Sequence, residues 1–428
     1  MADPPSSAWK EFSVERVAPF ERGGSQLIVE VDLTDPDLYG AGDLHSVFDS
    51  LRRRPGLFWN AERDGPGFWA VTRYADAVSV YKDVRRFTST RGTILRPTRR
   101  RIDPACGRML VMTDAPRHTR LKQILNRGFT PKMVERLQDR LTSSVAEIVD
   151  AAIRQGHCDF VGDVSARIPV VAICELMGVP PEDWSMMYEL TSTAFSSGDP
   201  DYALSSSGRF SSASAHSEIL DYYSRLLTRR RRAPADDLVS VLAAAEIAGE
   251  RLSDQEVLFN CDNLIVGGNE TVRHAAAGGM LALLERPGEL ARLRSDLSHM
   301  DTAVEEMLRW TTPGMHVLRT CRRNAVVGGQ TVRAGEQVVV WNISANRDAA
   351  EFRDPHAFDV SRSPNRHLAL GFGEHYCLGA ALARMELRTL MKYVLTHVSR
   401  MELIGPVRRL RSNLVSGFKR LPVELHPS

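Results

Sequence analysis

The ten residues Leu370-Gly-Phe-Gly-Glu-His-Tyr-Cys-Leu-Gly379 are the most informative stretch of this sequence, and a helix-forming run, Ala380-Ala-Leu-Ala-Arg-Met-Glu-Leu387, follows directly. Glycines in such a loop let the backbone approach a flat ligand closely. Cys377 stands where the helix is predicted to begin, and the dipole and free N–H groups of a helix N-terminus favour a thiolate over a thiol. We therefore predict that Cys377 is a metal ligand. The alternatives are a buried cysteine in a tight turn and a dinucleotide-binding loop, although Tyr376 replaces the third glycine of the latter.

A second informative stretch, Gly267-Gly-Asn-Glu-Thr271, lies in the middle of a long predicted helix. Each glycine inside a helix costs about 1 kcal/mol relative to alanine, so the pair needs a reason. The Thr271 hydroxyl is spaced to bond the Gly267 carbonyl, which would bend the helix and open a groove for dioxygen and a water. Glu270 is placed to relay protons from solvent. Close packing against another helix explains the glycines equally well.

The third motif is Glu306-Met-Leu-Arg309, an acid and a base three residues apart on one predicted helical face. Taken alone, this spacing is typical of a surface ion pair. Its weight comes from its position between the other two motifs.

Helical patterns dominate the chain, with short strands predicted at 68–74 and 336–342. Ser253-Asp-Gln-Glu256 is a capping box that opens a helix predicted to run to about Glu285. A final helix is predicted to begin at Cys377. Because no internal repeat or linker is visible, we predict a single domain over residues 1–428, mainly α with small β-sheets.

The three motifs, in this order, resemble those of the cytochrome P-450 superfamily, particularly its soluble bacterial members. The resemblance covers nearly the whole chain and includes Asp114-Ala-Pro-Arg-His118 and Ala345-Asn-Arg-Asp348. It implies a single-domain fold with a long kinked central helix over a haem, and the activity of a haem-thiolate monooxygenase. In that setting the Cys377 thiolate donates electrons to the haem iron and favours cleavage of the O–O bond.

The resemblance also implies a role for each matching residue. Cys377 would be the axial ligand of haem b (iron protoporphyrin IX), and Thr271 with Glu270 would activate the co-substrate O₂ and deliver protons. A structural salt-bridge triad behind the haem would consist of Glu306, Arg309 and Arg362. The residues implied to hold the cofactor are His118, Lys122, Arg319, His375, Gly268, Phe372 and Gly379.

Two positions depart from the family pattern. Leu370 occupies the place of an aromatic residue that packs near the sulfur, so haem packing and electronics are expected to shift while ligation persists. Lys122 replaces the usual arginine, and lysine pairs a propionate only as a point charge without the fork geometry.

The implied substrate pocket is mainly apolar, as small-molecule sites usually are. Its predicted lining is Ile265, Val266, Met315, Val317, Leu318 and Val415, and plain core packing explains each of these residues at least as well. A predicted irregular loop over 91–108 contains Arg96, Arg99, Arg100, Arg101 and Arg108, which either recognise an anionic group or are simply solvated.

These features favour hydroxylation or epoxidation of a mainly apolar small molecule in secondary-metabolite tailoring. Steroid or lipid hydroxylation and oxidative ring closure or coupling without net oxygenation are the alternatives on the same haem site. A haem-binding sensor without turnover is a further alternative, against which the proton-relay pair speaks.

Composition limits the partners. A formal net charge of +2 argues against nucleic acid as a partner. Residues 1–22 lack a signal-peptide pattern, no apolar run is long enough to span a membrane, and six scattered cysteines do not indicate a disulfide framework. We therefore expect a cytoplasmic protein that does not bind membranes.

No flavin or iron–sulfur module is recognised, so electrons are expected from a ferredoxin and a ferredoxin reductase. A basic docking face is predicted on the two helices that flank the thiolate side in the family. Its members are Arg117, Arg120, Lys122, Arg127, Arg384, Arg388 and Lys392, and scattered solvated charge is the alternative.

Overall fold

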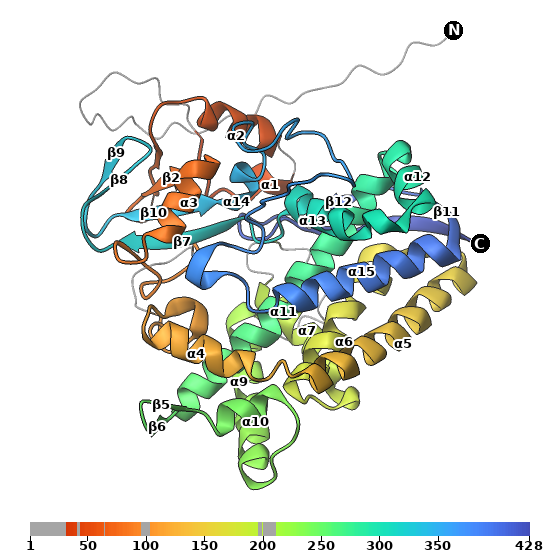
Figure 1. Ribbon diagram of the computed structural model, residues 1–428, viewed down its shortest axis with the longest axis horizontal. Coiled ribbons are helices and arrows are strands. Elements are labelled where there is room, and N and C mark those ends of the chain that lie inside the picture. The colour runs from red at the N-terminus through yellow and green to blue at the C-terminus, as the bar shows by residue number, and fades with distance from the viewer. Residues whose placement is uncertain (1–30, 41–42, 64, 96–102, 196–198, 200–210) are drawn as a thin grey trace.

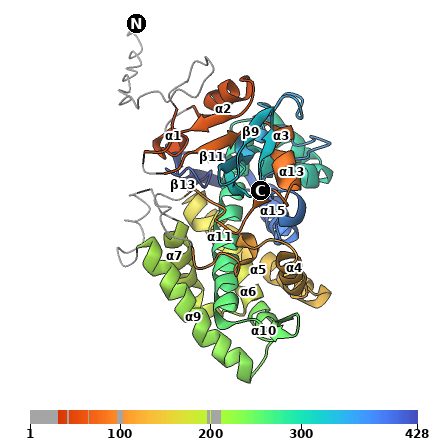
Figure 2. The same ribbon diagram turned by 90° about the vertical axis from the view of Figure 1, so that its left-hand side faces the viewer.

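The computed structural model describes residues 31–40, 43–63, 65–95, 103–195, 199 and 211–428. Its central element is α11 (Asp254–Leu284), a 31-residue helix that passes through the middle of the molecule in both views (Figures 1 and 2). The Ser253 side chain accepts the N–H of Glu256 while the Glu256 carboxylate accepts the N–H of Ser253, which confirms the predicted capping box. The helix ends one residue before the predicted Glu285.

Helices surround α11 on several sides and form most of the molecule (Figure 1). Their bounds are α1 Asp37–Gly40, α2 Leu44–Arg52, α3 Tyr74–Lys82, α4 Arg117–Asn126, α5 Pro131–Gln155, α6 Arg167–Met177, α7 Trp184–Phe195, α9 Ser212–Arg232, α10 Leu238–Ala243, α12 Pro287–Ser295, α13 Met300–Thr311, α14 Asn342–Ala345 and α15 Ala380–His397. A π-helical turn, η2 (Phe160–Ser165), leads towards α6, and a 3₁₀ turn, η5 (Gly373–His375), lies in the cysteine loop.

The strands form one five-stranded sheet and several small ones. The large sheet has the order β1-β2-β10-β7-β3, in which β10 and β2 are parallel and the other neighbours antiparallel. Its strands are β1 Phe58–Asn60, β2 Phe68–Val71, β3 Phe87–Thr88, β7 His316–Cys321 and β10 Gln337–Trp341.

The smaller sheets pair β11 with β14 and β4, β12 with β13, β5 with β6, and β8 with β9. Their strands are β4 His157–Asp159, β5 Glu246–Ile247, β6 Glu250–Arg251, β8 Ala325–Val327, β9 Gln330–Val332, β11 Val398–Leu403, β12 Arg408–Arg409, β13 Phe418–Arg420 and β14 Pro422–Pro427. The predicted strands at 68–74 and 336–342 correspond to β2 and β10.

The core consists of two large apolar clusters that share α11. One contains buried residues of the N-terminal part of α11 together with α4, α6, α7, α9 and α10. The other contains residues of its C-terminal part with α5, α13 and α15. Two smaller clusters pack against the five-stranded sheet. The fold is thus mainly α with small β-sheets, as predicted.

None of the helices in the described part of the chain combines the length and hydropathy needed to cross a bilayer. Arg96, Arg99, Arg100 and Arg101 of the predicted arginine-rich loop lie outside the described residues. Arg108 is described, and its Nη1 donates to the carbonyl of Pro104.

Candidate active site

The cysteine loop folds back on itself between the sheet region and α15. Gly371 and Gly373 have φ angles of +72° and +71°, in the left-handed region that favours glycine. The N–H of Cys377 donates to the carbonyl of Leu370 at 2.9 Å and closes the loop. Helix α15 begins at Ala380, so the prediction that it starts at Cys377 is wrong by three residues. The intervening turn keeps the thiol outside the first helical turn.

Cys377 is exposed by its solvent-accessible area, yet many protein atoms surround its thiol. These surroundings act on the pKa of the thiol in two directions. Burial among the surrounding protein atoms raises the pKa of the Cys377 thiol, and this is the dominant effect. The backbone N–H of Gly379 and the positive charges of Lys122 and Arg384 lower that pKa. The helix terminus therefore assists a thiolate through one N–H group rather than through a full capping position.

Three cationic or imidazole side chains gather beside this loop. His118 of α4 and His375 of η5 have ring centroids 4.1 Å apart, and Arg319 of β7 is buried next to them. Burial, then the charge of Arg319, lowers the pKa of His375 to about 2, and burial, then Lys122, lowers the pKa of His118 to about 4. The nearby carboxylate of Asp114 is already bound by the N–H of Ser89 and by Arg322.

This donor set fits a ligand that carries its own carboxylates. His118 Nδ1 is buried without a hydrogen-bond partner among the described residues, and Arg319 has only the carbonyl of Leu318 as its recorded acceptor. An unbalanced group of buried donors is costly unless an anion joins it. The two propionates of haem supply such anions. Ser89, whose hydroxyl lies 3.2 Å from His375 Nε2, belongs to this set and had no signal in the sequence.

The other residues predicted to hold the cofactor have different surroundings. Phe372 is half-buried beside the sheet cluster, with Lys82 Nζ 5.7 Å from its ring centroid. A Cβ added at Gly379 would meet nothing within 4 Å, so this glycine leaves space at the start of α15. Lys122 Nζ donates to the carbonyls of Glu374 and Tyr376, both at 2.7 Å. Its recorded partners are therefore in the cysteine loop.

In α11 the predicted bond between Thr271 and Gly267 is present. Thr271 is half-buried, and its Oγ1 donates to the Gly267 carbonyl at 3.0 Å. The two glycines have different surroundings: a Cβ at Gly267 would meet nothing within 4 Å, whereas one at Gly268 would lie 2.9 Å from Ile173 Cδ1. Gly268 therefore allows α11 to pack on α6, and its predicted contact with the cofactor stays a prediction. Gly267 is the glycine that faces open space.

Glu270 lies in a buried polar network. Its Oε1 accepts the Ser192 hydroxyl at 3.0 Å and lies 3.3 Å from Arg273 Nη1, and its Oε2 lies 3.3 Å from His274 Nε2. Burial raises the pKa of Glu270, but Arg273, His274 and Ser192 together outweigh it and bring the pKa to about 2. Arg273 and His274 follow Glu270 by three and four residues, so helical spacing could have revealed them, whereas Ser192 of α7 could not be found this way.

The third motif is buried, so its interpretation as a surface pair does not hold. Glu306 and Arg309 of α13 are both 0% exposed, and the Arg309 guanidinium donates two bonds of 2.7 Å to the Glu306 carboxylate. Arg362 Nε donates to Glu306 Oε2 at 3.1 Å, which completes the predicted triad. Asn365, which also donates to Glu306, was not predicted.

The predicted substrate-pocket residues divide among several apolar clusters. Ile265 and Val266 pack with α6, α7 and α9, Met315 and Leu318 pack near Trp341, and Val415 packs with Leu410. Leu318 and Arg319 point to opposite faces of β7 because side chains alternate along a strand. Val317 shares the face of Arg319 and is half-buried. For Met315 and Leu318, each 1% exposed, the contacts favour plain core packing.

Three of the seven residues of the predicted basic face make ion pairs. Arg117 pairs with Glu256, Arg384 with Glu305, and Arg388 with Asp301. Helical spacing places Arg120 of α4 and Arg127, the residue that caps its C-terminus, on a side that differs from that of Lys122. The stripe Arg384, Arg388 and Lys392 on α15 remains next to the cysteine loop, since Arg384 Nη1 donates to the Tyr376 hydroxyl.

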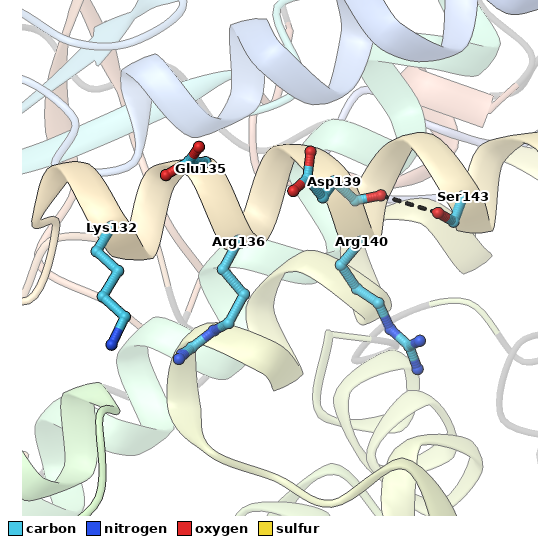
Figure 3. A pocket seen from close by; sticks show the side chains of 6 residues that line it. All are labelled: Lys132, Glu135, Arg136, Asp139, Arg140 and Ser143. Carbon is cyan, nitrogen blue, oxygen red and sulfur yellow. Dashed lines mark hydrogen bonds between the residues drawn. The ribbon is translucent and has the colours of Figure 1, made fainter.

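A surface pocket of about 450 Å³ lies elsewhere, on α5 (Figure 3). Lys132, Arg136 and Arg140 point to the same side of this helix in the close-up view, and Arg136 is paired with Glu175 and Asp236. The pocket is open and charged and contains none of the predicted site residues. It does not correspond to the predicted apolar substrate site.

Comparison with known proteins gives a consistent result. The family model described as Cytochrome P450 matches residues 210–401. Cytochrome P450 NovI of Streptomyces niveus is 37% identical over 92% of this chain and 96% of its own length. A steroid C26-monooxygenase of Mycobacterium tuberculosis is 34% identical over 92% of both chains.

Solved structures agree with these relatives. P450 OxyD, involved in the biosynthesis of vancomycin-type antibiotics, superposes with a TM-score of 0.84 and is 36% identical, covering 93% of this chain and 100% of its own. The cysteine loop, the set formed by His118, His375 and Arg319, and the extent of the sequence and structural similarity lead to one conclusion. The chain belongs to the cytochrome P450 family and is a cytochrome P450 monooxygenase.

Proposed function

We propose that this P450 binds haem b through Cys377 and uses O₂ to hydroxylate or epoxidise a mainly apolar small molecule in secondary-metabolite tailoring. The observation that carries the proposal is the set formed by His118, His375 and Arg319 beside the cysteine loop. It places a buried guanidinium and two imidazoles, all of them hydrogen-bond donors for an anion, beside a single thiol. Haem requires both features at once, a thiolate ligand and donors for its propionates.

Haem iron supplies the oxygen-activating chemistry when it is bound, and the side chains of this chain hold it and manage protons. Cys377 is the ligand, while His118, Arg319 and His375 hold the propionates. The Thr271 hydroxyl, bonded to the Gly267 carbonyl, is placed to pass a proton into the space beside Gly267. Glu270 is ionised and locked by Arg273 and His274, so its ion pairs must open before it carries a proton. Glu306, Arg309 and Arg362 brace the cysteine side of the fold.

The named relatives support the substrate class. OxyD is involved in antibiotic biosynthesis and shares 36% identity with this chain. The steroid C26-monooxygenase supports sterol or lipid hydroxylation as the alternative. We propose in addition that the enzyme is cytoplasmic and receives electrons from a ferredoxin and its reductase, with the α15 stripe as the docking contact.

The test is the absorption spectrum of the purified, reduced protein under carbon monoxide. We expect a strongly red-shifted Soret band that Cys377→Ala abolishes and that the control Cys106→Ala, which alters another cysteine of the described chain that is not fully buried, retains. An imidazole-type band, or no haem at all, would refute the proposal. Product mass then separates the reactions, because oxygenation adds one oxygen atom whereas ring closure removes two hydrogens.

A further inference from the structure

Lys122 makes contacts that the family pattern does not account for. This half-buried residue of α4 reaches the cysteine loop, where its Nζ donates to the carbonyls of Glu374 and Tyr376, both at 2.7 Å. The Tyr376 carbonyl belongs to the peptide group that ends at the nitrogen of Cys377. The N–H of this same peptide donates to the Leu370 carbonyl at 2.9 Å. Lys122 therefore binds the peptide unit that carries the ligand.

The chemistry of an ammonium group suits this position. Two carbonyl oxygens that point towards one place repel each other, and a compact charge with three rotatable donors satisfies both. A planar guanidinium fork matches a carboxylate better than two separate carbonyls. Gly371 and Gly373 bring no side chains to the loop, so the bonds from Lys122 add to the packing of Phe372 and Leu378.

The Lys122 ammonium also has different partners from the Arg384 guanidinium. Arg384 donates to both oxygens of Glu305, at 2.5 and 2.7 Å, so its charge is balanced. Lys122 donates instead to two backbone carbonyls. Burial lowers the pKa of Lys122, whereas the Glu374 carboxylate is close enough to act on this pKa in the opposite direction. Because its ammonium binds the carbonyl of the residue before Cys377, Lys122 places positive charge beside the cysteine.

We propose that Lys122 is a positioning residue for Cys377, whose ammonium clamps the cysteine loop to α4 and keeps the thiolate on the iron. The inference rests on the proposed function, because it concerns the haem-bound state. It adds two loop carbonyls to the predicted role of Lys122 at the cofactor. It also separates two contributions, a geometric clamp on the loop and a positive charge near the sulfur.

The test compares Lys122→Met, Lys122→Arg and the control Lys392→Met in the haem-loaded protein. The first readout is the rate at which the red-shifted CO band is lost in mild urea. We expect about tenfold faster loss in Lys122→Met, the size of effect expected when hydrogen bonds to a charged group are removed. Lys122→Arg keeps the charge but has a longer, planar head, so its rate should lie between those of the wild type and Lys122→Met, whereas Lys392→Met should match the wild type.

The second readout is the reduction potential of the haem. Lys122→Met should shift it to more negative values, because removing a positive charge disfavours the added electron. Lys122→Arg keeps the charge and should stay near the wild-type potential. A Lys122→Met protein with wild-type band lifetime and potential would overturn the inference, as would equal effects in Lys392→Met. A wild-type protein without the band would refute the proposed function instead, so the two failures are distinguishable.

Discussion

At the scale of single residues, the hydroxyl of Thr271 is the group whose removal is most informative. Thr271→Ala abolishes both the bond to the Gly267 carbonyl and the proton-passing group. We expect product formed per reductant consumed to fall on the order of 10²-fold, the usual contribution of a positioned proton-transfer group. Product and reductant are measured together in one reaction. Thr271→Ser keeps the hydroxyl and should remain close to wild type, and equal losses in both variants would contradict the assignment.

Glu270 gives a pH-dependent prediction. Its pKa of about 2 in the folded protein lies below the usual 4.5, so its ionised form stabilises the fold above about pH 4.5 and this contribution is lost as pH falls towards 2. Glu270→Gln should lower the free energy of unfolding at pH 7 by on the order of 2–3 kcal/mol. Urea denaturation at several pH values measures the gap to wild type. The gap should narrow below pH 4.5, and one that stays constant or widens there would refute the prediction.

Single residues also show where sequence reasoning ends. The contacts of Thr271 with Gly267 and of Glu306 with Arg309 are local along a helix, so spacing predicted them. The partners Ser192 of Glu270 and Ser89 of His375 come from distant segments and left no pattern. The contact of Gly268 with Ile173 of α6 was not predicted, because sequence does not tell which side of a helix faces a neighbour.

At the scale of elements, the start of α11 depends on its capping box. Ser253→Ala removes the acceptor for the Glu256 N–H and should cost about 1 kcal/mol of unfolding free energy. Thermal or urea denaturation measures this cost. Ser224→Ala, an exposed position in the middle of α9, is the matched control and should change stability by less than about 0.5 kcal/mol. Equal effects of the two substitutions would mean that the cap does not stabilise α11.

Elements were predictable where local signals were strong. The capping box marked the start of α11, alternation with aromatic and β-branched residues marked β2, and a strand signal at 336–342 marked β10. The start of α15 was placed three residues early, because the glycine-rich loop before Ala380 has no side-chain cap that would mark the boundary. The depth of α13 was also missed, since an acid–base pair has the same spacing on a buried face as on an exposed one.

For the whole molecule, the prediction concerns the electron donor. Arg388→Gln with Lys392→Gln removes two charges of the α15 stripe, and Arg120→Gln with Arg127→Gln removes two from another side of α4. We expect the first pair to slow reduction by an acidic ferredoxin several-fold at low salt, with the difference vanishing at high salt. The second pair should change the rate less. Stopped-flow measurements of the rate of haem reduction over a range of ionic strength test this. A larger effect of the Arg120 and Arg127 substitutions would place the docking face on α4.

The long central helix α11 links the two large apolar clusters, and this has a consequence for how the molecule unfolds. Every residue from Val272 to Leu283 is buried, and the two large apolar clusters pack on successive segments of α11, so we expect the unfolding of either cluster to destabilise the other. Amide hydrogens in this stretch should therefore exchange with deuterium only when the whole chain unfolds. Exposed segments such as the end of α9 should exchange through local fraying. Mass spectrometry of the peptides should then show the slowest deuterium uptake in the stretch Val272–Leu283 and faster uptake at the end of α9.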